Sequence, residues 1–471
     1  MCIEQHGIAG YELMQRAGLS LFQQIQSRYP DCRSMTIFCG AGNNAGDGYV
    51  IATLARAAGI DAEVWALIDP QQLQGDAAKA AQAYLEDGGA VELDFDSRKP
   101  GDLVVDAILG TGLDRPVEGR FLEVINRVNS MDAPVVSVDI PSGLNADTGT
   151  AMPTAIRAEL TVGFIGQKRG LYTGQAVDYT GALEFDDLGA PDAIYQAMPK
   201  DAELLHESAI SQHLPSREPS THKGQLGHVL VAGSDHGYPG AVALAARAAL
   251  MAGSGLVSVA TRQEHAVAMA AALPEVMWAD GEAFERLDRL VQRADVVALG
   301  PGLGDSDWSR RIWHRLASAG LPMVLDADGL NCLQQAPRQC LDWVLTPHPG
   351  EAARLLNCSV DDIQADRYAA VRTLAEQFCA TVVLKGAGSL IANPEGAVRV
   401  CPYGNPAMAT AGMGDALTGI IASLLGQGLD GFDAASTGVL LHALAGDQAA
   451  VHRRQVIASE LITALSSVLP K

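Results

Sequence analysis

A glycine-rich turn followed by an aspartate occurs in the stretch TAGMGDALTG (410–419). Gly412 and Gly414 open a predicted helix, and Asp415 falls in its first turn. The free N–H groups of a helix N-terminus bind anions, and glycine lets a phosphate approach the backbone. A carboxylate there repels phosphate unless it accepts a proton from an attacking hydroxyl. The stretch therefore predicts phosphoryl transfer with Asp415 as the base; the structural alternative is a helix start that favours Asp through its dipole.

Further polar turns follow apolar runs in the same half of the chain. Lys385 with Gly386–Ser389 combines backbone amides, a cation and a hydroxyl, a set that is typical of a nucleotide-phosphate site. Glu351 is suited to order Mg²⁺ through water. His348 lies between two prolines and either contacts a substrate or caps its loop. The turns are GPGLG (300–304), DADGLN (326–331), TPHPGE (346–351) and LKGAGS (384–389).

Three polar turns in the first half of the chain also follow predicted strands. Because ligands of parallel sheets bind beyond the carboxyl ends of the strands, we expect the three turns to converge. Asn44, Asp106 and Ser142 offer hard oxygen ligands for a cation such as K⁺ or Mg²⁺. Asp139 is the candidate acid–base residue, with a capping or ion-paired aspartate as the alternative. The turns are GAGNNAGDG (40–48), DAILGTGLDRP (106–116) and SVDIPSGLNADTG (137–149).

The first of these turns also fits a dinucleotide fingerprint formally, through Gly40, Gly42 and Ala45. Two features disfavour that interpretation. Asp61 precedes the next predicted strand, whereas the ribose-binding acid should follow it. Asp47 places a negative charge where a pyrophosphate would approach. Helix capping by the asparagines and the aspartate of the turn is the structural alternative to a ligand site.

The elements that must position these residues alternate between strands and helices. Such alternation predicts right-handed βαβ units around parallel sheets, in an α/β fold. The polar segment 198–224 contains three prolines and no predicted strand, so we place the boundary of two domains, 1–203 and 204–471, within it. Predicted strands of the first domain lie in 34–39, 62–67, 102–109, 133–140 and 159–165, with helices at 46–59 and 76–88. Those of the second lie in 227–234, 256–261, 294–304, 322–330, 342–351 and 380–392.

Composition limits the classes of partner. The 471 residues carry a formal charge of −22, which disfavours nucleic acid and anionic membranes as partners. No apolar run reaches the roughly 18 residues of a membrane span, and no signal peptide is visible, so we expect a cytoplasmic protein. The cysteines show no C-x-x-C spacing, which disfavours zinc binding. They are Cys2, Cys32, Cys39, Cys332, Cys340, Cys358, Cys379 and Cys401.

The motifs of the first half together resemble the NAD(P)H-hydrate epimerase family, whose domain is a Rossmann-like three-layer α/β/α fold. The resemblance rests on GAGNNAGDG, DAILGTGL, VDIPSGLNADTG and TVGFIGQKRGL. It implies that Asp139 acts at the reacting ring and that Asn44, Asp106 and Ser142 bind K⁺. Lys168 matches a lysine of the family, although a surface role fits it equally well, and Ala45 replaces a usual glycine. The implied hydrate-binding residues are Asn43, Asn44, Ala45, Gly46, Asp47, Gly110, Thr111, Gly112, Leu113, Asp114, Arg115 and Pro116.

The motifs of the second half resemble the ADP-dependent NAD(P)H-hydrate dehydratases, which have a ribokinase-like three-layer α/β/α fold. The resemblance rests on HKGQLGHVLVAGS, GYPGAVALAARAALMAGSGLV, GPGLG, LTPHPGE and AGMGDALTG. It implies that Asp415 is the base at the ring hydroxyl and that the amides of Gly412 and Gly414 stabilise the transferring phosphoryl group. The implied hydrate pocket contains Ala241, Gly302, His348 and Asp415. The implied nucleotide-binding residues are Lys385, Gly386, Ala387, Gly388, Ser389, Gly412 and Gly414.

The two resemblances together imply one repair enzyme for hydrated nicotinamide cofactors. The first domain would interconvert the R and S forms of NADHX and NADPHX, and the second would dehydrate the S form with ADP. Three rival interpretations stay open. The second domain could belong to a small-molecule kinase that leaves a stable phosphorylated product. The chain could be a pyridine-nucleotide dehydrogenase. The first domain could be a non-catalytic binding module, alone or joined to such a kinase. The sequence leaves open the choice between NADHX and NADPHX, between ADP and ATP, and whether a homo-oligomer forms.

Overall fold

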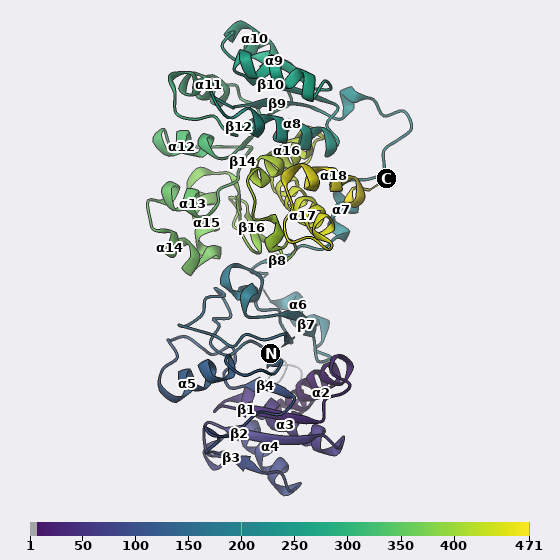
Figure 1. The fold of residues 1–471 in the computed structure, drawn as a ribbon, viewed down its shortest axis with the longest axis vertical. Coiled ribbons are helices and arrows are strands. Elements are labelled where there is room, and N and C mark those ends of the chain that lie inside the picture. Colours follow the sequence, from purple (N-terminus) through teal and green to yellow (C-terminus); the bar gives the residue numbers. More distant parts are fainter. Residues whose placement is uncertain (1–6, 199, 471) are drawn as a thin grey trace. The chain divides into compact units, whose positions relative to one another are not determined.

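The computed structural model describes residues 7–198 and 200–470. The chain divides into two compact units, with the boundary between Lys200 and Asp201. Each unit is built on its own sheet with helices against it (Figure 1). The sequence-based boundary between 203 and 204 falls within the second unit. The first six residues, including Cys2, lie outside the described residues. The other seven cysteines are free.

The first unit is a parallel sheet of seven described strands in the order β3-β2-β1-β4-β5-β6-β7. The chain runs outward from β1 to β3 and then returns to place β4 on the other side of β1. The strands are β1 (Ser34–Cys39), β2 (Asp61–Ala66), β3 (Val91–Glu92), β4 (Leu103–Ala107), β5 (Val135–Val138), β6 (Leu160–Phe164) and β7 (Ala182–Asp186). The helices are α2 (Gly10–Arg28), α3 (Asn43–Ala57), α4 (Gly75–Glu86), α5 (Gly119–Val128) and α6 (Asp192–Ala197), with 3₁₀ turns η1 (Pro70–Gln72), η2 (Arg169–Tyr172) and η3 (Gly174–Asp178).

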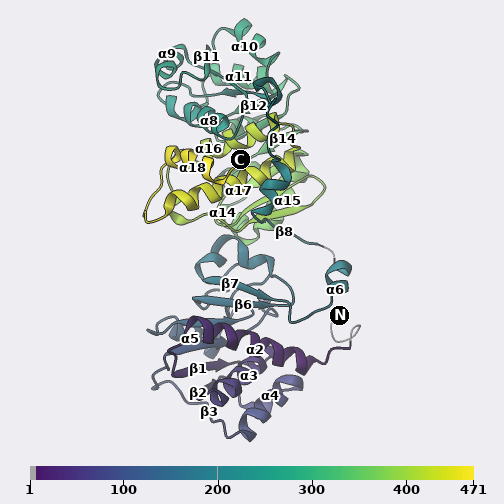
Figure 2. The ribbon, with the colours of Figure 1, turned by 90° about the vertical axis from the view of Figure 1, so that its right-hand side faces the viewer.

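Neighbouring residues of β1 supply two different cores, as the period of two in a strand requires. Ile37 packs with α2, α3 and α4, whereas Phe38 packs with Trp65, Phe95 and the buried side of α5. Both sheet faces are therefore covered, and the unit has three layers, as the sequence predicted. Figure 2 shows α2, α3 and α4 beside strands β1–β3.

The second unit contains a sheet of ten described strands in the order β11-β10-β9-β12-β13-β14-β15-β16-β17-β8. Its strands are β8 (Glu203–Leu204), β9 (His228–Ala232), β10 (Leu256–Thr261), β11 (Met277–Asp280), β12 (Val296–Leu299), β13 (Met323–Leu325), β14 (Trp343–Leu345), β15 (Thr381–Leu384), β16 (Ser389–Ala392) and β17 (Val398–Cys401). The first helices are α7 (Ser208–His213), α8 (Pro239–Met251), α9 (Gln263–Ala272), α10 (Phe284–Val291), α11 (Asp307–Ala317) and α12 (Asp328–Gln335). The others are α13 (Pro349–Leu356), α14 (Val360–Ala365), α15 (Arg367–Phe378), α16 (Met413–Gly426), α17 (Gly431–Ala450) and α18 (Ala458–Val468), with η4 (Lys223–Gln225) and η5 (Pro406–Met408).

Most expected strands are confirmed, and three details of the prediction are wrong. Segment 198–224 does contain a strand, because β8 satisfies the free edge of β17 by parallel pairing. The second sheet is not wholly parallel: β15, β16 and β17 pair antiparallel, since the four residues between β15 and β16 cannot make a crossover. Helix α3 begins at Asn43 rather than at residue 46, with extended Gly42 before it.

Both sheets have a point at which the strand order reverses, between β1 and β4 and between β9 and β12. Ligands of open α/β sheets bind at the carboxyl ends of strands near such points. Asp61 is the first residue of β2 and therefore lies at the amino ends of the strands, away from the predicted ligand sites. The two reversal points therefore fix where each site must be sought.

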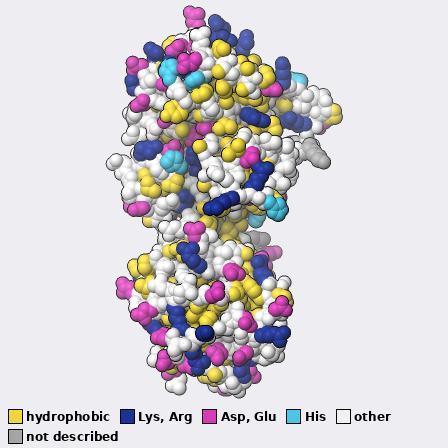
Figure 3. All heavy atoms as spheres, in the orientation of Figure 1, with side chains coloured by type: hydrophobic (Ala, Val, Ile, Leu, Met, Phe, Trp, Pro, Cys, Tyr) yellow, Lys and Arg dark blue, Asp and Glu magenta, His cyan; other side chains and the backbone are white. Residues whose placement is uncertain are grey.

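The surface and the helices add two general observations. On the face drawn in Figure 3, acidic and basic side chains are interspersed rather than gathered by sign. Within the described residues, every helix is too short or too polar to cross a lipid bilayer.

Candidate active sites

The turn after β1 meets the turn after β4 at the reversal point of the first sheet. A Cβ on Gly40 would lie 1.9 Å from the carbonyl oxygen of Ile108, so only glycine lets the two turns cross this closely. Asn44 is buried in the first turn of α3, and its Nδ2 donates to the carbonyl of Leu109 at 3.1 Å. Gly110 lies beside the same asparagine. The predicted convergence of these turns is confirmed.

Asp106, the fourth residue of β4, is a fully buried carboxylate. Its Oδ2 accepts hydrogen bonds of 2.8 Å from the Ser142 N–H and the Ser137 hydroxyl, and its Oδ1 accepts one of 2.5 Å from the Ser142 hydroxyl. Burial raises the pKa of Asp106, and the hydrogen bonds from the two serines oppose that rise. No ion pair to Asp106 is present among the described residues. The site thus joins a buried negative charge to the oxygens of Ser142, Leu109 and Asn44.

A second cluster in the first unit brings together Asp139, Lys168 and Asp47. Lys168 Nζ forms a short ion pair with Asp139 Oδ1 and donates to the carbonyl of Phe164 at 2.9 Å. Asp139 Oδ1 also accepts from the Phe164 N–H at 2.9 Å. Burial, and then the charge of Asp139, raises the pKa of Asp47 well above its usual range, with Lys168 opposing. The cluster therefore sets a carboxyl with a raised pKa beside an ion-paired carboxylate, a pattern typical of acid–base sites.

The backbone of Asp139 is itself unusual. Its φ of 66° lies in the left-handed region, which residues other than glycine rarely adopt. Asp and Asn tolerate this conformation better than other side chains do. The conformation follows directly after β5, where the strand ends, and residues held in such conformations cluster at functional sites.

The remaining residues predicted to hold the hydrate lie in two different environments. Ala45 and Gly46 are buried against the helices of the core, and a Cβ on Gly46 would lie 2.4 Å from the Cε of Met14. Leu113 is half-buried, and its carbonyl accepts from Asn145 at 3.4 Å. The others form an exposed edge above the strand ends: Asn43, Thr111, Gly112, Asp114, Arg115 and Pro116.

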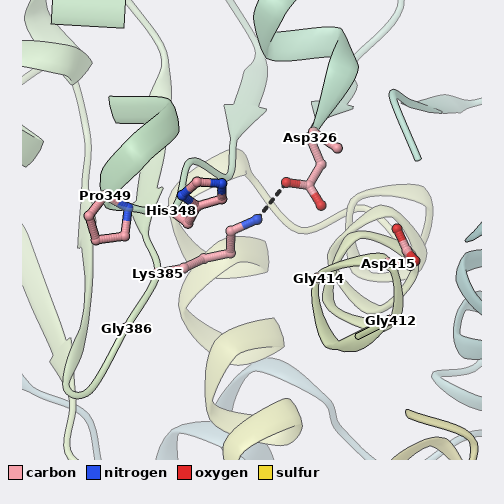
Figure 4. A pocket seen from close by; sticks show the side chains of 9 residues that line it. Asp326, His348, Pro349, Lys385, Gly386, Gly412, Gly414 and Asp415 are labelled. Atoms are coloured by element: carbon pink, nitrogen blue, oxygen red, sulfur yellow. Dashed lines mark hydrogen bonds and ion pairs between the residues drawn. The ribbon is translucent and has the colours of Figure 1, made fainter. Parts of the chain in front are cut away.

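In the second unit a cavity of about 410 Å³ opens at the carboxyl ends of β13, β14 and β15 and at the start of α16 (Figure 4). Asp415 enters it from the first turn of α16, as predicted. Burial, and then the charge of Asp326, raises the pKa of Asp415 to about 6, with Lys385 opposing. No hydrogen bond or ion pair to the Asp415 carboxylate occurs among the described residues. The carboxylate is thus poised to exchange a proton near neutral pH. The cavity is lined by Asp326, Ala327, His348, Pro349, Lys385, Gly386, Gly412, Gly414 and Asp415.

Lys385 and Asp326 form the central ion pair of this cavity, with Nζ and Oδ1 2.6 Å apart (Figure 4). Asp326 Oδ2 also accepts from the Thr418 hydroxyl at 3.0 Å. Although burial works in the opposite direction, the charge of Lys385 keeps the pKa of Asp326 below its usual value. Asp326 and then Glu351 raise the pKa of Lys385 against the effect of burial. The lysine is therefore a fixed positive charge within the cavity.

Glu351 and His348 are joined in a capping box at the start of α13. The Glu351 carboxylate accepts from the His348 N–H at 2.8 Å and lies 3.7 Å from Lys385 Nζ. His348 Nδ1 accepts from the Gly350 N–H at 3.0 Å, and the ring also lines the cavity. Of the two roles that the sequence left open for His348, capping is thus present in the structure. Contact with a substrate stays a prediction.

The predicted nucleotide-binding residues lie in two places around the cavity. Gly412 and Gly414 flank the start of α16, and a Cβ on Gly414 would lie 3.2 Å from Asp326 Oδ2 and 3.4 Å from Lys385 Nζ. Residues 385–388, among them Ala387 and Gly388, form the turn between β15 and β16. The Ser389 hydroxyl braces that turn by donating to the Gly386 carbonyl at 3.0 Å.

Ala241, in α8, and Gly302, in the turn after β12, lie together near the carboxyl ends of β9 and β12, where the strand order reverses. A Cβ on Gly302 would lie 3.4 Å from that of Ala241. Neither residue lines the 410 Å³ cavity. The predicted hydrate pocket therefore spans two neighbouring parts of one edge.

The sequence interpretation missed three features of these sites. It quoted Asp326 within a motif but gave it no role, although its place directly after β13 was the available signal. It did not assign Lys168 to Asp139, because a separation of 29 positions gives no spacing signal. It did not foresee that Ala327 adopts φ 47° and ψ −121°, a sparsely populated conformation, beside Asp326.

Two known families match the chain. The family described as NAD(P)H-hydrate dehydratase matches residues 228–471. The family described as YjeF-related protein N-terminus matches residues 10–170.

Two relatives match the chain over almost its whole length. The bifunctional NAD(P)H-hydrate repair enzyme of Coxiella burnetii is 44% identical and covers 97% of this chain and 94% of its own. The enzyme of the same name from Escherichia coli is 41% identical and covers 98% of this chain and 90% of its own.

Solved structures similar to this chain cover its second half. An ADP/ATP-dependent NAD(P)H-hydrate dehydratase from Bacillus subtilis, co-crystallised with ATP and Mg²⁺, is 29% identical with a TM-score of 0.51. The match covers 57% of this chain and 98% of that one. A ribokinase-like superfamily protein from Enterococcus faecalis is 26% identical with a TM-score of 0.55, covering 58% of this chain and 96% of that one.

Proposed function

Because the chain belongs to the family of bifunctional NAD(P)H-hydrate repair enzymes, we propose that Asp415 is the base of a dehydratase site and Asp139 that of an epimerase site. The observation that supports the first role best is the raised pKa of Asp415, to about 6, in a cavity with a fixed lysine. A group with a pKa near the working pH exchanges protons efficiently.

In the dehydratase unit, Asp415 takes the proton of the ring hydroxyl as its oxygen attacks the terminal phosphoryl group of ADP. The bond between the two phosphates breaks and AMP leaves. The ring nitrogen then expels the phosphate from the hydroxylated carbon, and loss of a proton from the neighbouring carbon restores NAD(P)H. The N–H groups at the start of α16, behind Gly412 and Gly414, hold the transferring phosphoryl group. Lys385 offsets the negative charge of the phosphates.

Mg²⁺ fits this cavity as a companion of the nucleotide. No group of three or more His, Cys, Asp or Glu side chains that could hold a metal ion is present among the described residues. The Glu351 carboxylate is already engaged by the His348 N–H, so it suits a contact through water. Mg²⁺ binds one or two carboxylates together with substrate phosphates, and it neutralises phosphate charge when bound.

In the epimerase unit, inversion at the hydroxylated carbon requires a bond at that carbon to break and form again. The C–O bond breaks with support from the ring nitrogen as Asp47, whose pKa is raised, donates a proton to the hydroxyl, which leaves as water. Asp139, held by Lys168, takes a proton from the water that adds to the other face and forms the new C–O bond. Asn43, Asn44 and the exposed edge of the loop 110–116 bind the rest of the hydrate. The separation of the two carboxyls into acid and base supports these roles.

K⁺ fits the oxygen-rich site around Asp106. A buried carboxylate there lies among a serine hydroxyl, a backbone carbonyl and an amide, from Ser142, Leu109 and Asn44. Such neutral oxygens suit a monovalent cation better than a divalent one. Asp106, Ser142, Asn44 and the Leu109 carbonyl would hold the ion, which would offset the charge of Asp106.

The experiment that tests both roles is recovery of absorbance at the reduced-nicotinamide band. The full chain is mixed with R and S NADHX, Mg²⁺ and either ADP or ATP. We expect complete recovery with ADP in the wild type, none in Asp415→Ala, and a slow second phase in Asp139→Ala. Failure to recover with either nucleotide would contradict the dehydratase assignment. A single fast and complete phase in Asp139→Ala would contradict the epimerase role and favour a non-catalytic first unit.

A further inference from the structure

Arg367 is a buried charged side chain that the chemistry above does not use. It is the first residue of α15, and 1% of its surface is exposed. Burial lowers the pKa of Arg367 to about 10, so the guanidinium remains charged at neutral pH. A buried charge is costly unless its hydrogen bonds compensate, so its partners indicate what it does.

Two of those partners are carbonyl groups at the end of β15. Arg367 Nη2 donates to the carbonyl of Leu384 at 3.2 Å and to that of Lys385 at 3.3 Å. Nη1 donates to Gln364 Oε1 at 3.1 Å. The turn between β15 and β16 begins at Lys385, so the guanidinium holds the backbone at the point where the turn leaves the strand.

The same guanidinium fills the space beside Gly386. A Cβ on this glycine would lie 3.1 Å from Arg367 Nη2 and 3.2 Å from Nη1, and the φ of Gly386 is +144°. Ser389 also holds Gly386 in place. Its hydroxyl accepts from the Gly386 N–H at 3.3 Å and donates to the Gly386 carbonyl. Gly386 also lines the cavity that holds Asp415. The arginine thus lies directly behind a wall of the cavity.

We propose that Arg367 is a positioning residue for nucleotide phosphates: its guanidinium fixes the turn 385–388 and places a positive charge behind the turn's amides. The inference rests on the proposed role of Lys385–Ser389 in nucleotide binding. Amides held in place before the ligand arrives need no reorganisation, and a fixed charge behind them favours a polyanion. Arg367 is therefore expected to determine nucleotide affinity without contacting the reacting atoms.

The test compares Arg367→Met and Arg367→Lys in the full chain with Arg372→Met. Arg372 belongs to the same helix, but it is more exposed and pairs with Asp201 at 2.8 Å, so its loss should have little effect. We measure kcat and KM for ADP in dehydration, the inhibition constant of AMP, and thermal unfolding. Epimerisation on the same preparation controls for the amount of folded first unit.

We expect Arg367→Met to raise the KM for ADP about tenfold, as for the loss of a charged hydrogen-bond donor, while kcat changes less than about threefold. AMP should be affected less than ADP, because it carries less charge. Arg367→Lys should recover part of the loss by restoring the charge. Should Arg367→Met unfold the second unit, the lysine variant alone is measured, with an expected rise of about threefold. An unchanged KM, or equal losses in kcat and in affinity for ADP and AMP, overturns the inference.

Gly386→Ala and Lys385→Met separate this inference from the proposed function. If both variants raise the KM for ADP while Arg367→Met does not, the turn binds nucleotide and only the role of Arg367 fails. If neither changes the KM, the turn is not the nucleotide site and the proposed assignment fails first. If Arg367 acts through the turn, Gly386→Ala combined with Arg367→Met should raise the KM by less than the product of the single effects.

Discussion

The two units each place a lysine–aspartate ion pair at the carboxyl edge of a parallel sheet, but they use it on different carboxylates. In the first unit Lys168 binds Asp139, the proposed base itself. In the second unit Lys385 binds Asp326, and the proposed base, Asp415, has no ion pair among the described residues. The lysine is therefore paired with the proposed base in one site and with the carboxylate beside the proposed base in the other.

The second carboxyl of each site shows the consequence of this difference. Asp47 is half-buried, and desolvation followed by the charge of Asp139 raises its pKa well above the usual range. Asp415 is half-buried, and desolvation followed by the charge of Asp326 raises its pKa to about 6. In the proposed mechanisms, two aspartates and a lysine thus supply a proton donor, Asp47, in one unit and a proton acceptor, Asp415, in the other.

The largest expected effect concerns Asp415. Asp415→Asn removes the proton acceptor and should lower kcat for dehydration by about 10²–10⁴-fold, while epimerisation is unchanged. The measurement is absorbance recovery for dehydration, with the R/S ratio of the hydrate followed by chromatography. Asp307→Asn, on an exposed position of α11, is the matched control. An equal loss of both activities would break the comparison, because it would indicate global damage.

A somewhat smaller effect is expected at Asp139. Asp139→Asn keeps a side chain that tolerates the left-handed backbone but cannot accept the proton, so epimerisation should fall by about 10²-fold. Lys168→Met should cost less, because the carboxylate remains. The R/S exchange rate is measured without nucleotide. Dehydration of pure S hydrate must stay at its wild-type rate in both variants, or the two sites are not separate.

The pH dependence should differ between the two activities by about tenfold at pH 5. Asp415 works as a base only when ionised, so kcat for dehydration should fall as the pH drops through about 6. Asp47 donates a proton, so epimerisation should persist in acid and decline at high pH. Lys385→Met removes a charge that lowers the pKa of Asp415, and the acid limb should move to higher pH. Identical profiles for the two activities would contradict the assignment of opposite roles.

The smallest expected effect is that of K⁺. Replacing tetramethylammonium by K⁺ should stabilise the first unit by about 1 kcal/mol, through binding to the folded state alone. The unfolding temperature of that unit should rise by roughly 2–4 °C, with little change in the second. Asp106→Asn should abolish the difference, whereas Asp102→Asn, which is exposed and lies four residues before Asp106, just ahead of β4, should retain it. A shift of equal size in both units would indicate a general salt effect.

The sequence predicted the order of the elements and the place of the sites, because strand–turn–helix patterns are local. Asp415 after Gly412 and Gly414 was found from spacing alone, and the structure places it in the cavity. Pairs that join distant segments were not found. Asp326 and Lys385 are 59 residues apart, and nothing in their local sequence shows that they meet.

The sequence also did not predict features that depend on the local backbone conformation or on burial. The antiparallel pairing of β15 and β16 depends on a turn of four residues that reads equally well as a phosphate loop. The conformation of Ala327 is held by the surrounding fold, since alanine has no preference for it. No sequence pattern singles out Arg367, and its contact with the turn is visible only from its burial and its hydrogen bonds to Leu384 and Lys385.

The short strand β8 has a practical consequence for separating the two activities. Glu203 and Leu204 pair with β17, and Asp201 forms an ion pair with Arg372, so these residues belong to the second unit although they precede most of it. A truncation that begins at residue 204 would remove half of an edge strand and leave β17 exposed to intermolecular pairing. A second unit expressed by itself should therefore retain the chain from Asp201 onward.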